Sequence, residues 1–361
     1  MILPEGGRRV AQALDALRHG WAIRVEPASA TDAAAGFDLL PAETGYAQPG
    51  IHAARVLISA ARAATLKLGN TIAFNPAAPV LIRGLEPFTL ATARDLADPA
   101  RDLASPLRGP FRVDPLPDAD VARTAMELAR MAGVLPAFLV ATGSTVAVTV
   151  TPDDLLMFRD GDGLSIQTRA HLPVAATDNA EIVAFRSRDD VREHVALIIG
   201  TQDRSRVPLV RLHSECLTGD ILGSLKCDCG PQLDAALRAM ADEAEHGGWG
   251  VLLYLRQEGR GIGLINKLRA YQLQDQGFDT VDANERLGLP NESRDFPVAA
   301  RMLDLLGVPA IRLMTNNPAK VDALRGVGVE VVERVPHELP ANPHNHRYLA
   351  TKRDRSGHLL D

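Results

Sequence analysis

All three cysteines of the 361-residue chain fall within fourteen positions, as Cys216, Cys227 and Cys229. One disulfide would leave a thiol over, and the opening residues MILPEGGRRV lack the apolar stretch of an export signal. Three thiolates suit Zn²⁺ well, and the spacing C-x10-C-x-C is typical of a metal site. The chain is therefore expected to fold so that these three side chains meet around one zinc ion.

The fourth coordination position decides which kind of zinc site this is. His213 stands three residues before Cys216. If His213 is a ligand, the site is a closed structural one; if it is not, a position stays open for water or substrate, as in a catalytic site. Spacing alone favours the two equally. The run of hydrogen-bonding residues 211–215 favours the open site, because a structural zinc loop has no need of a substrate wall.

Composition excludes several classes of function. A net charge of −6 and 4% aromatic residues provide neither a positive field for nucleic acid or anionic lipid nor a surface on which bases could stack. The longest apolar runs, such as residues 251–255, are far too short to span a bilayer. We therefore expect a globular cytoplasmic protein that binds no nucleic acid and no membrane.

The length predicts two domains. The chain turns polar and irregular between residues 160 and 192, so we place the boundary near residue 170, with domains at residues 1–170 and 171–361. The first domain has no cluster with metal or acid/base spacing. Its expected helices are residues 8–18 and 119–132, and its expected strands are residues 21–25 and 145–150.

In the second domain, short apolar runs alternate with helical stretches, which predicts an α/β fold. These runs are residues 195–199, 251–255, 311–314 and 329–332. Pro231 suits the first position of a helix that follows the cysteines. That position would place the thiols at a helix N-terminus, where the helix dipole is expected to lower their pKa.

Residues 256–263 (RQEGRGIG) follow the expected strand at residues 251–255. Glycines free the backbone N–H groups there, and arginine adds a bidentate phosphate partner, so the loop is interpreted as a phosphate cradle. It matches neither the Rossmann fingerprint nor the Walker loop. A structural turn is the alternative. Glu292 and Arg294 likewise pair a carboxylate with a cation, for which a surface ion pair is the alternative.

Five segments taken together closely resemble GTP cyclohydrolase II, the zinc enzyme of riboflavin biosynthesis. They are RLHSECLTGD, SLKCDCGPQLDAAL, LLYLRQEGRGIGLINKLRAYQLQDQGFDT, SRDF and RLMTNNPAK, and the resemblance covers residues from about 172 to 361. It implies a mixed sheet with flanking helices and an enzyme that converts GTP to formate, pyrophosphate and 2,5-diamino-6-ribosylamino-4(3H)-pyrimidinone 5′-phosphate. It also implies Mg²⁺ at the triphosphate, and a homodimer.

The resemblance also implies roles for individual residues. The three cysteines hold Zn²⁺ with one position left for water, which attacks C8 of the guanine. Tyr271 assists proton transfer at the ring, Arg294 stabilises charge at the α-phosphorus, and Glu292, where the family usually has aspartate, is its acid/base partner. The implied GTP-binding residues are Arg211, Leu212, His213, Ser214, Glu215, Gln232, Glu258, Gly259, Arg260, Thr280, Thr315 and Lys320.

The N-terminal half resembles dihydroxybutanone phosphate synthase, through RVAQALDALRHGWAIRV and MELARMAGVLPAFLVA. That family follows its first strand with an acidic cluster that binds Mg²⁺, whereas this chain has EPASATD at residues 26–32. We therefore expect this domain to be non-catalytic and to support folding or dimerisation. Two alternatives remain for the whole chain: a related enzyme that opens a purine ring differently, or a non-catalytic zinc-stabilised nucleotide-binding protein.

Overall fold

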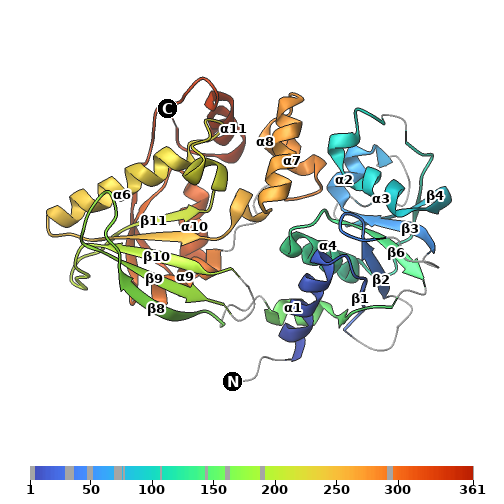
Figure 1. Cartoon of the computed structure of the whole chain (residues 1–361), viewed down its shortest axis with the longest axis horizontal. Coiled ribbons are helices and arrows are strands. Elements are labelled where there is room, and N and C mark those ends of the chain that lie inside the picture. Colours follow the sequence, from blue (N-terminus) through green and yellow to red (C-terminus); the bar gives the residue numbers. More distant parts are fainter. Residues whose placement is uncertain are drawn as a thin grey trace. The chain divides into compact units, whose positions relative to one another are not determined.

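The computed structural model describes residues 5–28, 36–46, 52–68, 75, 78–105, 108–142, 145–158, 163–187, 192–290 and 296–360. The chain forms two compact units (Figure 1), one made of Met1–Asp160 and Ile265–Asn291 and the other of Gly161–Leu264 and Glu292–Asp361. Each contains a mixed sheet with flanking helices, which confirms the predicted α/β class. Across the described ranges, no helix combines the length and apolarity needed to cross a membrane.

The first unit is built on a sheet of strand order β5-β4-β3-β6-β2-β1-β7. In that order the strands are Arg112–Asp114, Val80–Phe88, His52–Ile58, Ala137–Thr142, Phe37–Pro41, Ile23–Val25 and Thr149–Val150. Helices α1 (Glu5–Arg18) and α4 (Ala119–Ala132) share one apolar core with this sheet and agree with the predicted helices. Three shorter helices, α2 (Ala60–Thr65), α3 (Leu90–Ala97) and α5 (Pro152–Phe158), belong to the same unit.

Helix α4 shows why these residues are helical. The Asp118 carboxylate accepts hydrogen bonds from the backbone N–H groups of Asp120 and Val121, which would otherwise lack partners in the first turn. Gly133 ends the helix with φ = 77°, a conformation that glycine adopts without strain. The buried residues between these caps include Val121, Ala125 and Leu128, which recur at helical spacing.

The units do not follow the division expected near residue 170. Strand β8 (Ser165–His171) already belongs to the sheet of the second unit, and helices α7 (Leu264–Asp275) and α8 (Thr280–Arg286) pack with the first. Arg269 Nη2 lies 2.9 Å from Glu43 Oε1, and the Glu43 Oε2 atom accepts a hydrogen bond from the Leu135 N–H. Asn266, fully buried, donates to the carbonyl of Gly133. These contacts join segments that sequence patterning treats as separate.

The second unit has the strand order β14-β13-β11-β12-β10-β9-β8. Beyond β8 its strands, in chain order, are β9 Ala180–Arg186, β10 His194–Ile199, β11 Leu209–Ser214, β12 Gly250–Leu255, β13 Ala310–Met314 and β14 Glu330–Val335. The pairs β11·β12, β11·β13 and β13·β14 are parallel, whereas β8 to β10 continue the sheet antiparallel. The carboxyl ends of β11, β12 and β13 therefore lie at one edge, where ligand-binding loops collect in such folds.

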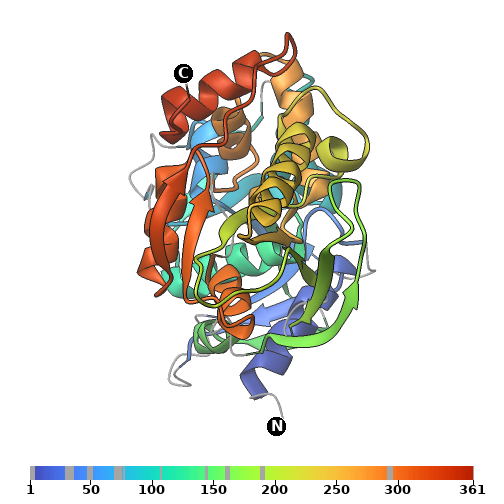
Figure 2. The ribbon, with the colours of Figure 1, turned by 90° about the vertical axis from the view of Figure 1, so that its left-hand side faces the viewer.

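Helices cover both faces of this sheet (Figure 2). Leu252 shares an apolar cluster with Met240 of α6 (Cys229–Glu245), whereas Val251 and Leu253 belong to the cluster on the opposite face. That second cluster includes α9 (Phe296–Leu305) and α10 (Pro318–Gly326). Burial on both faces explains why β12 is a continuous apolar run rather than an alternating one.

Candidate metal centre

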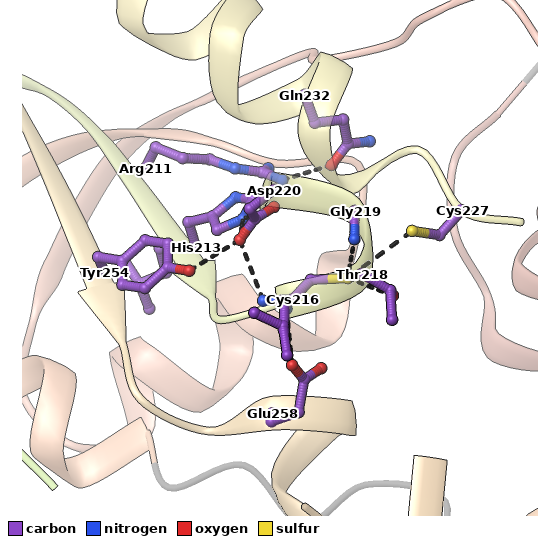
Figure 3. Close-up of polar contacts among 12 residues, drawn as sticks. Arg211, His213, Cys216, Thr218, Gly219, Asp220, Cys227, Gln232, Tyr254 and Glu258 are labelled. Atoms are coloured by element: carbon purple, nitrogen blue, oxygen red, sulfur yellow. Dashed lines mark hydrogen bonds and ion pairs between the residues drawn. The ribbon is translucent and has the colours of Figure 1, made fainter. Parts of the chain in front are cut away.

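The three cysteines converge at the carboxyl edge of the second unit's sheet. Figure 3 shows two of them, Cys216 and Cys227, with the residues around them. Cys216 follows β11 and begins a single π-helical turn, Leu217–Ile221, while Cys229 is the first residue of α6. Their sulfurs and that of Cys227 all lie within 4.8 Å of one another, and none forms a disulfide. The 3.7 Å between the Cys216 and Cys227 sulfurs matches the separation of about 3.8 Å expected for two thiolates on a tetrahedral zinc.

Gly219 has no side chain, and this keeps open the space that the three sulfurs enclose. A Cβ atom built on Gly219 would come within 3.0 Å of the Cys216 and Cys227 sulfurs and of the Cys229 Cβ. The Gly219 N–H also points at the Cys216 sulfur, 3.3 Å away, an arrangement that stabilises a thiolate. The cradle and its donor set therefore fit a bound zinc ion.

The pKa values of the thiols also favour a bound cation, although they are raised rather than lowered. The pKa of Cys227 is raised to about 11, mainly by the nearby Cys216 thiol, and burial raises it further. Cys216 and Cys227 likewise raise the pKa of Cys229. This direction is opposite to the lowering expected from the helix N-terminus, because the neighbouring sulfurs and burial act against ionisation of Cys227 and Cys229. Joint ionisation requires a cation to offset the charge.

Substituting Gly219 by alanine is expected to lower zinc affinity by about 10- to 100-fold while the fold is kept, because the added methyl group enters the cradle. Competition with a chromophoric chelator measures this change. Gly326→Ala in α10 is the matched control, since a Cβ at Gly326 meets nothing within 4 Å. Unchanged zinc affinity in Gly219→Ala would contradict the fit of the ion to this cradle.

A buried carboxylate holds the first cysteine's loop in place. Asp220 Oδ2 accepts hydrogen bonds from the Cys216 N–H at 3.0 Å and from the Tyr254 hydroxyl at 2.9 Å. His213 Nε2 lies 3.0 Å from Asp220 Oδ1, and the His213 ring stacks on Tyr254 with centroids 5.6 Å apart. Burial first, and then the Asp220 charge, raises the pKa of Tyr254, so its hydroxyl stays a donor. Three donors from two strands and a turn thus meet on one carboxylate.

This network engages one of the two ring nitrogens of His213. His213 Nε2 is committed to Asp220, and Nδ1 is buried without a partner among the described residues. In that part of the chain the metal-binding group comprises the three cysteines and no histidine. Among the described residues the structure therefore brings the three cysteines together without His213.

Several residues predicted to bind substrate lie beside the cluster. Arg211 Nη2 donates to Gln232 Oε1 at 2.5 Å and its Nη1 donates to the Met314 carbonyl. Lys320 Nζ lies 3.3 Å from the Leu212 carbonyl oxygen. Residues from β11, α6 and α10 are thereby brought together.

Three further predicted residues lie at the carboxyl ends of the parallel strands β11 and β13: Ser214, Glu215 and Thr315. Ser214 is the last residue of β11, and Glu215 Oε2 pairs with Arg256 Nε at 2.9 Å. Thr315, only 2% exposed, follows β13 and accepts the Asn317 N–H. His337 is buried as well. Its pKa is lowered to about 4, chiefly by burial and then by the Arg211 charge, so its ring is neutral at pH 7.

The glycine-rich loop after β12 contains two residues in left-handed backbone conformations. Gly259 and Arg260 both adopt left-handed backbone conformations, with φ of 63° and 62°. For Arg260 this conformation is strained, a feature that concentrates at functional sites. The Glu258 carboxylate accepts the Leu217 N–H at 2.7 Å and so ties this loop to the π-helical turn.

Four predicted residues remain: two belong to the first unit and two are outside the described residues. Tyr271 is half-buried on α7, beneath Lys267, and Thr280 begins α8, so both belong to the first unit. Glu292 and Arg294 lie outside the described residues. Sequence analysis missed Asp220 as a functional residue. Its only signal is an acidic residue in the turn four positions after the first cysteine.

The fold and site define an α/β protein with a buried cluster of three cysteines suited to a metal ion. The family model of GTP cyclohydrolase II matches residues 165–336. A GTP cyclohydrolase-2 from Azospirillum brasilense is 43% identical over 378 aligned residues, covering 98% of this chain and 94% of that protein. The chain belongs to the GTP cyclohydrolase II family.

Other relatives match parts of the chain. A GTP cyclohydrolase-2 from Azotobacter vinelandii is 63% identical over 169 residues, which cover 47% of this chain and 79% of that protein. The riboflavin biosynthesis protein RibBA from Bacillus cereus is 48% identical over 213 residues, covering 59% of this chain and 53% of the relative. The solved structure of RibBX, a two-domain 3,4-dihydroxy-2-butanone 4-phosphate synthase from A. baumannii, covers 91% of this chain and 99% of its own with 17% identity and a TM-score of 0.30.

Proposed function

We propose that this protein is a GTP cyclohydrolase II that hydrolyses GTP to formate, pyrophosphate and 2,5-diamino-6-ribosylamino-4(3H)-pyrimidinone 5′-phosphate, the first step of riboflavin biosynthesis. The observation that carries the proposal is the buried cradle of three thiols around Gly219 in a chain of this family. Zinc held by Cys216, Cys227 and Cys229 supplies Lewis acidity for opening the guanine ring.

The residues of the chain have separate tasks in this proposal. Arg211 and Lys320 bring positive charge to the substrate beside the cluster, and Arg260 adds a guanidinium from the strained loop. Tyr271 transfers a proton at the opened ring. Arg294 stabilises charge at the α-phosphorus, which suits a guanidinium that stays protonated, and Glu292 is its acid/base partner. Mg²⁺ accompanies the triphosphate, and the active form is a cytoplasmic homodimer.

The test of this function is product identity. The zinc- and magnesium-loaded protein is incubated with GTP, all products are identified by mass spectrometry, and formate is quantified. Formate, pyrophosphate and the diaminopyrimidinone phosphate in equal amounts support the proposal. A retained formyl group would show a truncated reaction instead, and GTP binding without turnover would favour a nucleotide-binding protein.

We also propose that the N-terminal part has no lyase activity. Residues 29–32 of the EPASATD stretch lie outside the described residues, but Glu26 is described, and its carboxylate accepts a hydrogen bond from Arg24 Nε at 3.0 Å. A carboxylate engaged by arginine is a poor ligand for Mg²⁺. Incubation with ribulose 5-phosphate and Mg²⁺ is therefore expected to yield no dihydroxybutanone phosphate by mass spectrometry, and detectable product would refute this part of the proposal.

A further inference from the structure

A lysine near the end of the chain reaches the loop that carries two of the cysteines. Helix α11 (His346–Ser356) begins ten residues beyond position 336, where the match to the family model ends. From this helix Lys352 Nζ lies 2.8 Å from Asp228 Oδ1, and Asp228 stands between Cys227 and Cys229. Both side chains are buried, with 12% and 7% of their surfaces exposed. An ion pair this well buried is a specific structural element rather than a surface contact.

The other carboxylate oxygen of Asp228 begins a chain of hydrogen bonds into the substrate-binding surface. Asp228 Oδ2 accepts from Gln232 Nε2 at 2.7 Å, and Gln232 Oε1 accepts from Arg211 Nη2 at 2.5 Å. Gln232 and Arg211 both belong to the proposed GTP-binding set. The orientation of these two side chains therefore depends on Asp228, and the charge of Asp228 is balanced by Lys352.

The lysine itself is held at a fixed place. Its ammonium group lies 4.4 Å from the centre of the Tyr348 ring, a cation–π contact on the same helix. Beyond the helix, Gly357 turns the chain with φ = 64°, and the Leu359 N–H donates to the carbonyl of Asn316 at 2.8 Å. Asn316 in turn follows Thr315 at the end of β13. The end of α11 is thus bonded to the same sheet edge that carries the site.

Electrostatics explains what the lysine accomplishes. Asp228 is a buried carboxylate directly beside thiols that must become thiolates when zinc binds. Lys352 is the cation in direct contact with Asp228, and Arg211 is linked to the same carboxylate through Gln232. If Lys352 were neutral, Asp228 would attract the Arg211 guanidinium, to which Gln232 already links it, and turn that guanidinium away from the substrate.

We propose that Lys352 is a positioning residue for the nucleotide site: by pairing with Asp228 it keeps Gln232 and Arg211 directed at GTP. The inference rests on the proposed function, since it presumes that GTP is the ligand of these residues. It extends the site to a helix that the family match does not reach. Lys352 does not touch the reacting atoms in this role, so its loss acts on binding more than on chemistry.

The test compares full-length Lys352→Met with wild type by calorimetric titration of GTP into zinc-loaded protein, with kcat and KM measured in parallel. We expect Kd and KM to rise about tenfold and kcat to stay within about threefold. The conservative variant Lys352→Arg is expected to keep most of the affinity. Arg353→Met, which removes a half-exposed cation from the neighbouring position of α11, is the matched control and is expected to bind GTP as wild type does.

A double variant separates positioning from direct phosphate binding. In Asp228→Asn/Lys352→Met the charge that needed balancing is gone, and asparagine still offers an oxygen to Gln232, so Kd is expected to return to within about threefold of wild type. A double variant as weak as Lys352→Met would overturn the proposal in favour of direct contact with GTP. An unchanged Kd in Lys352→Met, or weakening fully explained by lost zinc, would overturn it as well. A wild type that binds GTP without turnover would refute the proposed function while the Kd comparison still decides the role of Lys352.

Discussion

Replacing Cys227 by serine is expected to abolish stoichiometric zinc binding and to reduce formate release from GTP by about 10³-fold or more. Two thiolates and a hydroxyl at the three corners of this cradle hold zinc far more weakly than three thiolates, because the hydroxyl does not ionise at neutral pH. Without the ion, the Lewis acidity needed to open the ring is lost. Metal content by plasma mass spectrometry and formate release measure the two effects on the same sample.

Two controls make the result specific to the metal. The chain has three cysteines and all belong to the cluster, so Cys216→Ser and Cys229→Ser should lose zinc in the same way. Chelation followed by added zinc should restore the wild type and none of the variants. A Cys227→Ser protein that retains one zinc per chain would show that the ion is held by a different set of ligands.

Asp220→Ala is expected to destabilise the second unit by about 3–5 kcal/mol and to weaken zinc binding. The substitution leaves three donors, the Cys216 N–H, the Tyr254 hydroxyl and His213, without their acceptor, and the carboxylate they share is 3% exposed. Each unsatisfied buried group costs about 1–3 kcal/mol, less where water enters. Because one donor belongs to a metal ligand, the loss of fold and the loss of zinc should appear together in denaturant unfolding and metal content.

The matched control lies on the same unit. Asp234 forms an ion pair with Arg238 on the exposed side of α6, so Asp234→Ala removes a carboxylate and its partner's contact at the cost of only about 0.5 kcal/mol. Asp220→Asn should be intermediate, since an amide keeps one acceptor oxygen. Stability and zinc affinity of Asp220→Ala equal to those of Asp234→Ala would refute the role of Asp220 as the support of the first cysteine.

The metal centre was predictable from the sequence because its signal is local. Cys216, Cys227 and Cys229 have a spacing that few structures other than a metal site require, and Pro231 marks the helix beside them, which the structure extends back to Cys229. Strand β12 was equally predictable, since a strand buried on both faces is a continuous run of apolar residues. Both depend on residues close together in the chain.

The supporting contacts were not predictable, because they depend on tertiary packing between distant segments. Lys352 pairs with a residue 124 positions earlier, and nothing in the sequence around either one indicates the other. Tyr254 looks like one more strand residue until β11 and β12 are paired in register, with His213 opposite Tyr254. The membership of α7 in the first unit is likewise decided by burial of Asn266 and by the Glu43–Arg269 pair rather than by local pattern.

That membership has a consequence for the order in which the protein can be made. A ribosome that has synthesised residues 1–160 has delivered a unit that still lacks α7 and α8, which follow only after the 104 residues of Gly161–Leu264. The buried side of α7 then has to find a partner surface that emerged from the ribosome much earlier. Folding of the N-terminal unit is therefore completed only after residue 291 has emerged, and a fragment that ends near residue 160 would lack two helices of its own unit.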